Sequence, residues 1–192
     1  MGGEMWWRPR CLRVLAIRGV LVFVGPSGIT SQVIDVVEVV GESGRVDVVE
    51  ARATRAVVAE LLGRIGAGDA EAIAALYATV SDWKLDWPED EHGRTATPWI
   101  RYRATRADVA EHFREIARHH VPEEVGTVVE RILVDGPDAV ILGEIRQTAR
   151  PTRRAYRSRF ALHVTVENGL ITRHHVYEDS LAVAQAFEPS SP

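Results

Sequence analysis

The last third of the chain constrains the fold most, because it alternates apolar and polar residues over four consecutive stretches. The pattern predicts strands at about 125–134, 139–148, 156–166 and 170–178. Asp-Gly-Pro-Asp at 135–138 and Glu-Asn-Gly at 167–169 supply turn-forming residues between them. Since short turns join antiparallel neighbours, this part of the chain should form a meander within one sheet.

Helical patterns precede these strands. Apolar residues recur at the spacing of one helix face at Val57, Val58, Leu61, Leu62 and Ile65. Asp69 is a good helix-capping residue and predicts a short second helix after it. Thr105 and Asp108 have the spacing of a capping box, which predicts the start of a third helix.

A further strand is predicted between the second and third helices. Residues 81–88, SDWKLDWP, alternate large apolar with polar side chains and end at a proline, which stops a strand. A last short helix should follow Asp179 or Ser180. This order of elements is typical of an α+β domain, in which three helices pack on the concave face of a curved antiparallel sheet.

Composition and charge exclude several classes of protein. The 192 residues are 46% hydrophobic and 26% charged, which suits a folded domain, and the net charge of −4 argues against nucleic acid as a partner. The single cysteine, Cys11, excludes an internal disulfide or a multi-cysteine metal site. The histidines at 112, 119 and 120 are not spaced to share a metal, so we expect neither a metal nor a cofactor.

The first 50 residues differ from the rest, being rich in glycine and valine with little helical period. They are either a small strand appendage or a translated upstream region with the biological start near Val49. The N-terminus resembles a signal peptide, but Arg18 interrupts its apolar run, so we expect a cytoplasmic protein. No apolar stretch reaches membrane-spanning length, so we expect no membrane partner. We expect an N-terminal extension at 1–50, one domain at 51–188 and a tail at 189–192.

Four segments carry a resemblance to a known family. They are IGAGDAEAIAALYA at 65–78, the strand end DWP at 86–88, TRADVAEHFREIA at 105–117 and VTVENGLITRHHVYEDSLAVAQAF at 164–187. Together they resemble the SnoaL-like branch of the nuclear transport factor 2-like superfamily, over about residues 52–187. The resemblance implies a cone-shaped α+β barrel, usually homodimeric, with a pocket between sheet and helices. Relatives include polyketide cyclases, ketosteroid isomerases and limonene-epoxide hydrolases.

The chain departs from these relatives at their catalytic positions. The ketosteroid isomerases' base falls on Trp87, their oxyanion-hole tyrosine on Leu61 and their second aspartate near Leu162. The carboxylate of the epoxide hydrolases, on the last strand, falls on Val176. None of these four side chains can exchange a proton, so the reaction of a standard ketosteroid isomerase is not expected.

The last strand supplies other candidates. Alternation places His174, Val176 and Glu178 on the inner face of the sheet, so that His174 is a candidate base and Glu178 a candidate polar partner. The alternative is a histidine satisfied by its neighbours and a glutamate at a solvated rim. The outer face should carry Ile171 and Tyr177, and relatives usually pair through that face, so we expect a homodimer.

Other residues are candidates for a ligand pocket. They are Leu61, Trp83, Trp87, Trp99, Phe113, Glu144, Arg146, Leu162 and Val176. The large rings would suit a flat, mostly apolar ligand, although such rings also fill ordinary cores. Glu144 and Arg146 would orient a polar ligand group or form a salt bridge on the outer surface.

Two functions remain open at this point. The first is binding of a small polycyclic or aromatic metabolite, with cofactor-free acid–base chemistry such as cyclisation, isomerisation, dehydration or epoxide opening. The second is a non-catalytic ligand-binding or dimeric scaffold module, consistent with the missing catalytic carboxylates.

Overall fold

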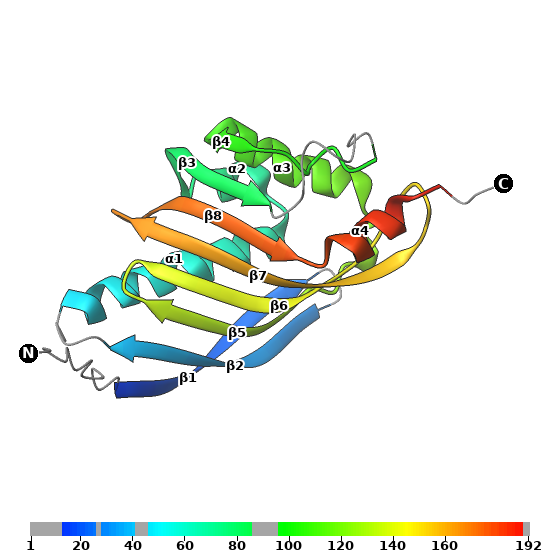
Figure 1. The fold of residues 1–192 in the computed structure, drawn as a ribbon. Coiled ribbons are helices and arrows are strands. Elements are labelled where there is room, and N and C mark those ends of the chain that lie inside the picture. The colour runs from blue at the N-terminus through cyan, green and yellow to red at the C-terminus, as the bar shows by residue number, and fades with distance from the viewer. Residues whose placement is uncertain (1–12, 26–27, 41–45, 86–95, 190–192) are drawn as a thin grey trace, which may run out of the picture.

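The computed structural model describes residues 13–25, 28–40, 46–85 and 96–189. These residues form an α+β fold, an open curved sheet with helices packed on its concave face (Figure 1). The strands are β1 (Arg13–Gly25), β2 (Gly28–Val40), β3 (Tyr77–Leu85), β4 (Arg103–Thr105), β5 (Val128–Asp135), β6 (Asp138–Thr148), β7 (Ala155–Glu167) and β8 (Leu170–Glu178). The helices are α1 (Val46–Ala67), α2 (Ala70–Ala74), α3 (Arg106–His119), the 3-10 helix η1 (Pro122–Glu124) and α4 (Ser180–Phe187).

The predicted meander is confirmed. Strands β5 to β8 are antiparallel neighbours in chain order, within the sheet order β1-β2-β5-β6-β7-β8-β3-β4. The turns use the residues that the sequence supplied, since Gly136, Asn168 and Gly169 all adopt positive φ angles. Asparagine and glycine tolerate this left-handed conformation, and for that reason the chain reverses there.

The sheet as a whole is mixed, whereas a fully antiparallel sheet was expected. Strand β3 runs parallel to β8, and β2 runs parallel to β5. A parallel neighbour needs a crossover, and helix α3 together with the meander provides it between β3 and β8. This pairing places Trp83 directly beside His174.

The N-terminal elements extend the sheet. Strands β1 and β2 form an antiparallel pair, and residues 35–38 of β2 join residues 131–134 of β5. Helix α1 begins at Val46, so it crosses the expected boundary at residue 51. None of the helices in the described part of the chain is both long and apolar enough to span a membrane.

The helices begin at the predicted caps. The Asp69 side chain accepts a hydrogen bond from the amide of Ala72, and Thr105 and Asp108 form a complete capping box at the start of α3. Asp179, one of the two residues expected, caps α4. These side chains satisfy amides that have no partner within a helix.

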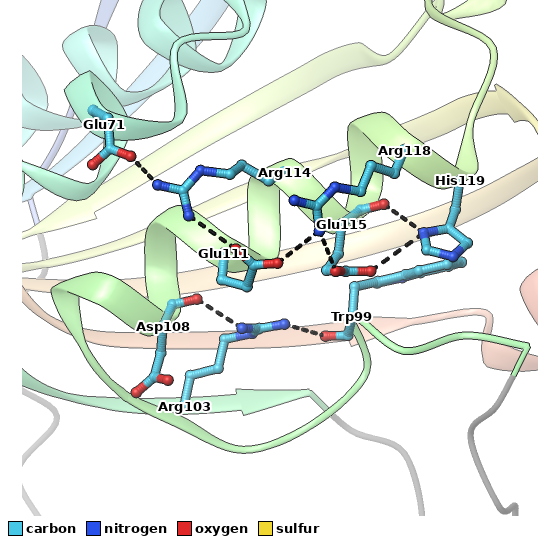
Figure 2. A network of polar contacts seen from close by, with 9 residues as sticks. All are labelled: Glu71, Trp99, Arg103, Asp108, Glu111, Arg114, Glu115, Arg118 and His119. Carbon is cyan, nitrogen blue, oxygen red and sulfur yellow. Dashed lines mark hydrogen bonds and ion pairs between the residues drawn. The ribbon is translucent and has the colours of Figure 1, made fainter.

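Charged residues fix α3 against α2 on the surface (Figure 2). Arg114 pairs with Glu71 of α2 and with Glu111 of its own helix, while Arg118 contacts Glu111 and Glu115. Exposed ion pairs contribute roughly 0–1 kcal/mol each, so this network orients α3 more than it stabilises the domain.

Two groups of buried side chains lie under the helices. The main core joins α1, α2 and the sheet and contains Val58, Leu61, Ile73, Tyr77, Trp83, Ile141, Leu162, Val164 and Ile171, among others. The end cluster consists of Trp99, Ile100, Ala149, Val183, Ala186 and Phe187, and it seats α4. Ile171 was expected on the outer face but is fully buried, because the β7–β8 register shifts between Thr165 and Val166.

Candidate functional site

A tyrosine–histidine pair lies inside the domain, where β3 and β8 run side by side. The Tyr77 hydroxyl oxygen is 2.8 Å from Nδ1 of His174, and His174 is only 4% exposed. Alternation along β8 turns His174 inward, and its neighbour His175 bonds Asp82 on the opposite face (Nε2–Oδ2 2.8 Å). The β3–β8 register shifts between Tyr77 and Asp82, and this irregularity accompanies the approach of Tyr77 to His174.

Trp83 covers the imidazole of His174. The two rings are parallel within 3°, with centroids 3.7 Å apart, and Trp83 is 1% exposed. A second histidine, His112 of α3, meets the indole edge-on at 4.8 Å. The indole Nε1–H of Trp83 is buried without a hydrogen-bond partner among the described residues. Buried donors are almost always paired, so this unpaired N–H is unusual. It is available to donate a hydrogen bond to a partner.

The tautomer of His112 follows from its contact with the end cluster. Its Nδ1 lies 3.2 Å from the backbone carbonyl oxygen of Trp99. A carbonyl only accepts, so Nδ1 carries the proton, and Nε2 of the neutral ring is an acceptor. Burial, followed by the nearby charge of Arg103, lowers the pKa of His112 to about 3, so the ring is neutral at physiological pH.

Arg103 of β4 lies between Trp99 and the start of α3, and it bonds the backbone of both (Figure 2). Its Nη1 donates to the carbonyl oxygen of Asp108 at 2.7 Å, and its Nη2 donates at 3.1 Å to the same Trp99 oxygen that His112 uses. The residue is 5% exposed, and its Nε–H has no partner within the described part of the chain. Burial, then the charge of Arg101, lowers the pKa of Arg103 to about 10, which leaves the guanidinium charged near neutral pH.

The electrostatics keep the tyrosine–histidine pair uncharged. Burial, then the fields of His112 and His175, lowers the pKa of His174 well below its ordinary value. Burial raises the pKa of Tyr77 above its ordinary value. If the Tyr77 hydroxyl donates to Nδ1, Nε2 of His174 carries the proton; if Nδ1–H donates to the hydroxyl oxygen, Nε2 is an acceptor. The pair therefore offers either a donor or an acceptor at Nε2 without a formal charge.

The residues predicted to line a pocket occupy several places. Leu61, Trp83 and Leu162 are buried in the main core, and Phe113 and Val176 pack against it. Trp99, expected to close a pocket from a loop, lies in the end cluster. Trp87 falls outside the described residues.

The predicted charged residues have partners of their own. Glu144 and Arg146 form an ion pair (Oε1–Nε 2.6 Å) with the Arg146 side chain 44% exposed, which corresponds to the surface salt bridge considered from sequence. The hydrogen bond from Arg146 lowers the pKa of Glu144. Glu178 is half-buried, and its charge adds to burial in raising the pKa of Tyr156 in the neighbourhood of the end cluster.

Sequence reasoning missed Tyr77, Arg103 and His112. His112 had a detectable signal, because it shares the inward helical spacing of Val109, Phe113 and Ile116 and so falls on the buried face of α3. Tyr77 shares helical spacing with Ile73 and was expected on the same face of the second helix, but α2 ends at Ala74 and Tyr77 begins β3. Arg103 had no such signal, since it acts through contacts made by other elements. Within the described ranges, no group of three or more histidine, cysteine or acidic residues is arranged to hold a metal ion.

Solved structures with the same fold come from several sources. An NTF2-like protein of unknown function from Burkholderia pseudomallei superposes with a TM-score of 0.61 and 18% identity, covering 71% of this chain and 98% of that one. An NTF2-like protein from Burkholderia thailandensis gives 0.60 and 20%, covering 71% and 98%. TerC, co-crystallised with polyporic acid, gives 0.59 and 15%, covering 71% and 99%. A comparison with curated protein sequences found no match.

The curved sheet with helices on its concave face thus has the fold of these NTF2-like proteins. The sequence profile of the SnoaL-like domain matches residues 58–174, the span from α1 to His174. The chain belongs to the SnoaL-like domain family.

Proposed function

We propose that the protein binds a flat, largely apolar metabolite, polycyclic or aromatic, and moves a proton on it without a cofactor. The observation that carries this proposal is the buried His174 imidazole, stacked on Trp83 and hydrogen-bonded to Tyr77. Aromatic surroundings favour a flat ligand, and histidine is the side chain whose unperturbed pKa lies closest to neutral pH.

The proton transfer needs only the two ring nitrogens of His174. With Nδ1–H donating to the Tyr77 oxygen, Nε2 accepts a proton from a carbon next to a ligand carbonyl, which leaves an enolate. The imidazolium then returns that proton to another ligand atom, and the protein ends unchanged. Burial opposes a lasting imidazolium, so the enolate would have to form beside it as a counter-charge.

One structural neighbour fits this ligand class. The structure of TerC was obtained with polyporic acid. At 15% identity the likeness shows a common fold, and we take from it only that a fold of this kind accommodates such a ligand.

Exchange of ligand protons for deuterium tests the proposal directly. The probe is 2-tetralone in D2O, a flat ketone whose protons next to the carbonyl are followed by NMR. We expect saturable acceleration by the protein, a loss of about 100-fold or more in His174→Gln, and no change in the matched outer-face variant His175→Gln. Absence of both binding and exchange would refute the proposal.

The second function, a non-catalytic binding or scaffold module, is favoured by Leu61 and Leu162. Both lie in the main core, at the positions where the resemblance places catalytic groups in relatives. Saturable binding of the ketone without proton exchange would identify the protein as such a module. In either case we propose a cytoplasmic homodimer that pairs through the outer face of the sheet, where Tyr177 is 48% exposed.

A further inference from the structure

We infer that Arg103 and Trp83 bind an anionic oxygen of the ligand, a carboxylate or an enolate, so that the preferred ligand is an acid. This inference rests on the proposed function, because it specifies the chemical class of molecule that the same interior takes. It depends on two buried N–H donors that have no partner among the described residues, and on the buried guanidinium to which one of them belongs.

The first line of evidence is the pair of free donors. The Nε1–H of Trp83 and the Nε–H of Arg103 are both buried and unpaired among the described residues. Leaving such a donor unsatisfied in the interior is unfavourable. An acceptor that binds both of these donors would remove that cost.

The two donors belong to one place in the fold. Trp83 and Arg103 are directly opposite in the antiparallel β3–β4 pair, and residues opposite each other project to the same side of a sheet. His112 connects them, since its ring meets Trp83 edge-on and its Nδ1 shares the Trp99 carbonyl with Arg103.

The positive charge of Arg103 favours a negatively charged acceptor. Among the residues that the structure describes, no carboxylate lies within salt-bridge distance of its guanidinium, and both of its hydrogen bonds go to backbone carbonyls. The carboxylates of Asp108, Glu111 and Glu115 act on this charge without bonding to it, so a negative ligand group in direct contact with the guanidinium would be stabilised. The lowered pKa of His112, to which Arg103 contributes, indicates that the region excludes a second positive charge.

The geometry also complements the proposed proton transfer. Trp83 contacts both His174 and His112, and Arg103 shares the Trp99 carbonyl with His112. A ligand stacked in this region could place an acid group toward Arg103 while a different atom faces His174. An enolate formed at His174 would gain from the same positive field.

A matched pair of probes tests the inference, namely 2-naphthoate and its neutral methyl ester, with dissociation constants from titration calorimetry. We expect the acid to bind at least about 10-fold more tightly, as a charged hydrogen bond implies. Arg103→Gln should remove the preference while ester binding persists, Arg103→Lys should retain part of it, and the exposed control Arg131→Gln should leave it unchanged.

The unmodified protein gives a second readout, in case Arg103→Gln does not fold. The NMR signals of the Arg103 Nε–H and the Trp83 indole N–H should both shift with 2-naphthoate, and the Arg103 signal should not shift with the ester. Equal binding of acid and ester, with the Arg103 signal unmoved, would overturn the inference and leave the proposed function standing. If neither probe binds, the proposed function and this inference both fail.

Discussion

Buried neutral histidines make the stability of this domain depend on mild acid. His112, His120 and His174 are all buried, and burial is the main cause that lowers the pKa of each one. The pKa of His112 falls to about 3 and that of His120 to about 4, whereas an unfolded histidine has a pKa of about 6.5. Between about pH 6.5 and these lower values, the unfolded chain therefore binds protons at histidines that stay neutral in the folded chain.

The sign and the size follow from proton linkage. Stability is fully present above the unfolded pKa of about 6.5 and is lost as the pH falls toward the folded values. Each histidine that is protonated only in the unfolded chain lowers the free energy of unfolding by about 1.4 kcal/mol per pH unit. Three such histidines give a slope that approaches ~4 kcal/mol per pH unit near pH 5. Burial raises the pKa of Asp82, but its contacts with His175 and Lys84 outweigh burial and lower the pKa overall. Protonation of Asp82 therefore reduces stability only below about pH 4. The three histidines together remove about 6 kcal/mol by pH 5 and about 10 kcal/mol by pH 4, so a stability in the lower half of the usual range of roughly 5–15 kcal/mol would be lost in that interval.

Urea unfolding from pH 7.5 to 4.5 measures this slope. The free energy of unfolding should fall steeply below pH 6.5, and His112→Asn, whose amide can still donate to the Trp99 carbonyl, should reduce the slope by close to one proton. The outer-face control His175→Gln should change it less. A stability that is flat between pH 6.5 and 4.5, or a slope that His112→Asn leaves intact, would refute the reasoning.

Three further outcomes are expected. Tyr77→Phe should cost about 1–3 kcal/mol in urea unfolding, because it leaves Nδ1 of the buried His174 unpaired; a neutral result would show that the hydroxyl does not hold the ring. Removal of residues 1–45, which keeps α1 whole, should change stability by no more than about 1 kcal/mol; a larger loss would make the β1–β2 pair part of the domain. Light scattering at micromolar concentration should give the mass of a dimer, for which we expect an interface of about 1,600 Å² in total. The mass of a monomer would exclude pairing through the sheet.

Local signals in the sequence predicted most of the fold. Turn residues such as Asn168 and Gly169 fixed the reversals of the meander, and Asp69, Thr105 and Asp108 fixed where helices begin. These signals act over a few residues, so they can be read without knowing the remainder of the chain. The local signal failed at Ile171, where a register shift between neighbouring strands overrode simple alternation.

The candidate site was predicted only in part, for the same reason. Alternation correctly turned His174 inward and His175 outward, because the direction of a side chain on a strand is a local property. The partners of His174 were not predictable in this way. Its contact with Tyr77 joins residues 97 positions apart, and that separation is bridged only because β3 inserts as the parallel neighbour of β8.

The sequence by itself therefore determined the elements, their caps and turns, and the inward face of the last strand. Tertiary structure alone decided that Trp83 stacks on His174, that the Trp99 carbonyl sets the tautomer of His112, and that the buried Arg103 donates to the backbone carbonyls of Asp108 and Trp99. Strand order and helix docking result from burying the apolar faces of many elements together, and no short stretch of sequence encodes that joint arrangement.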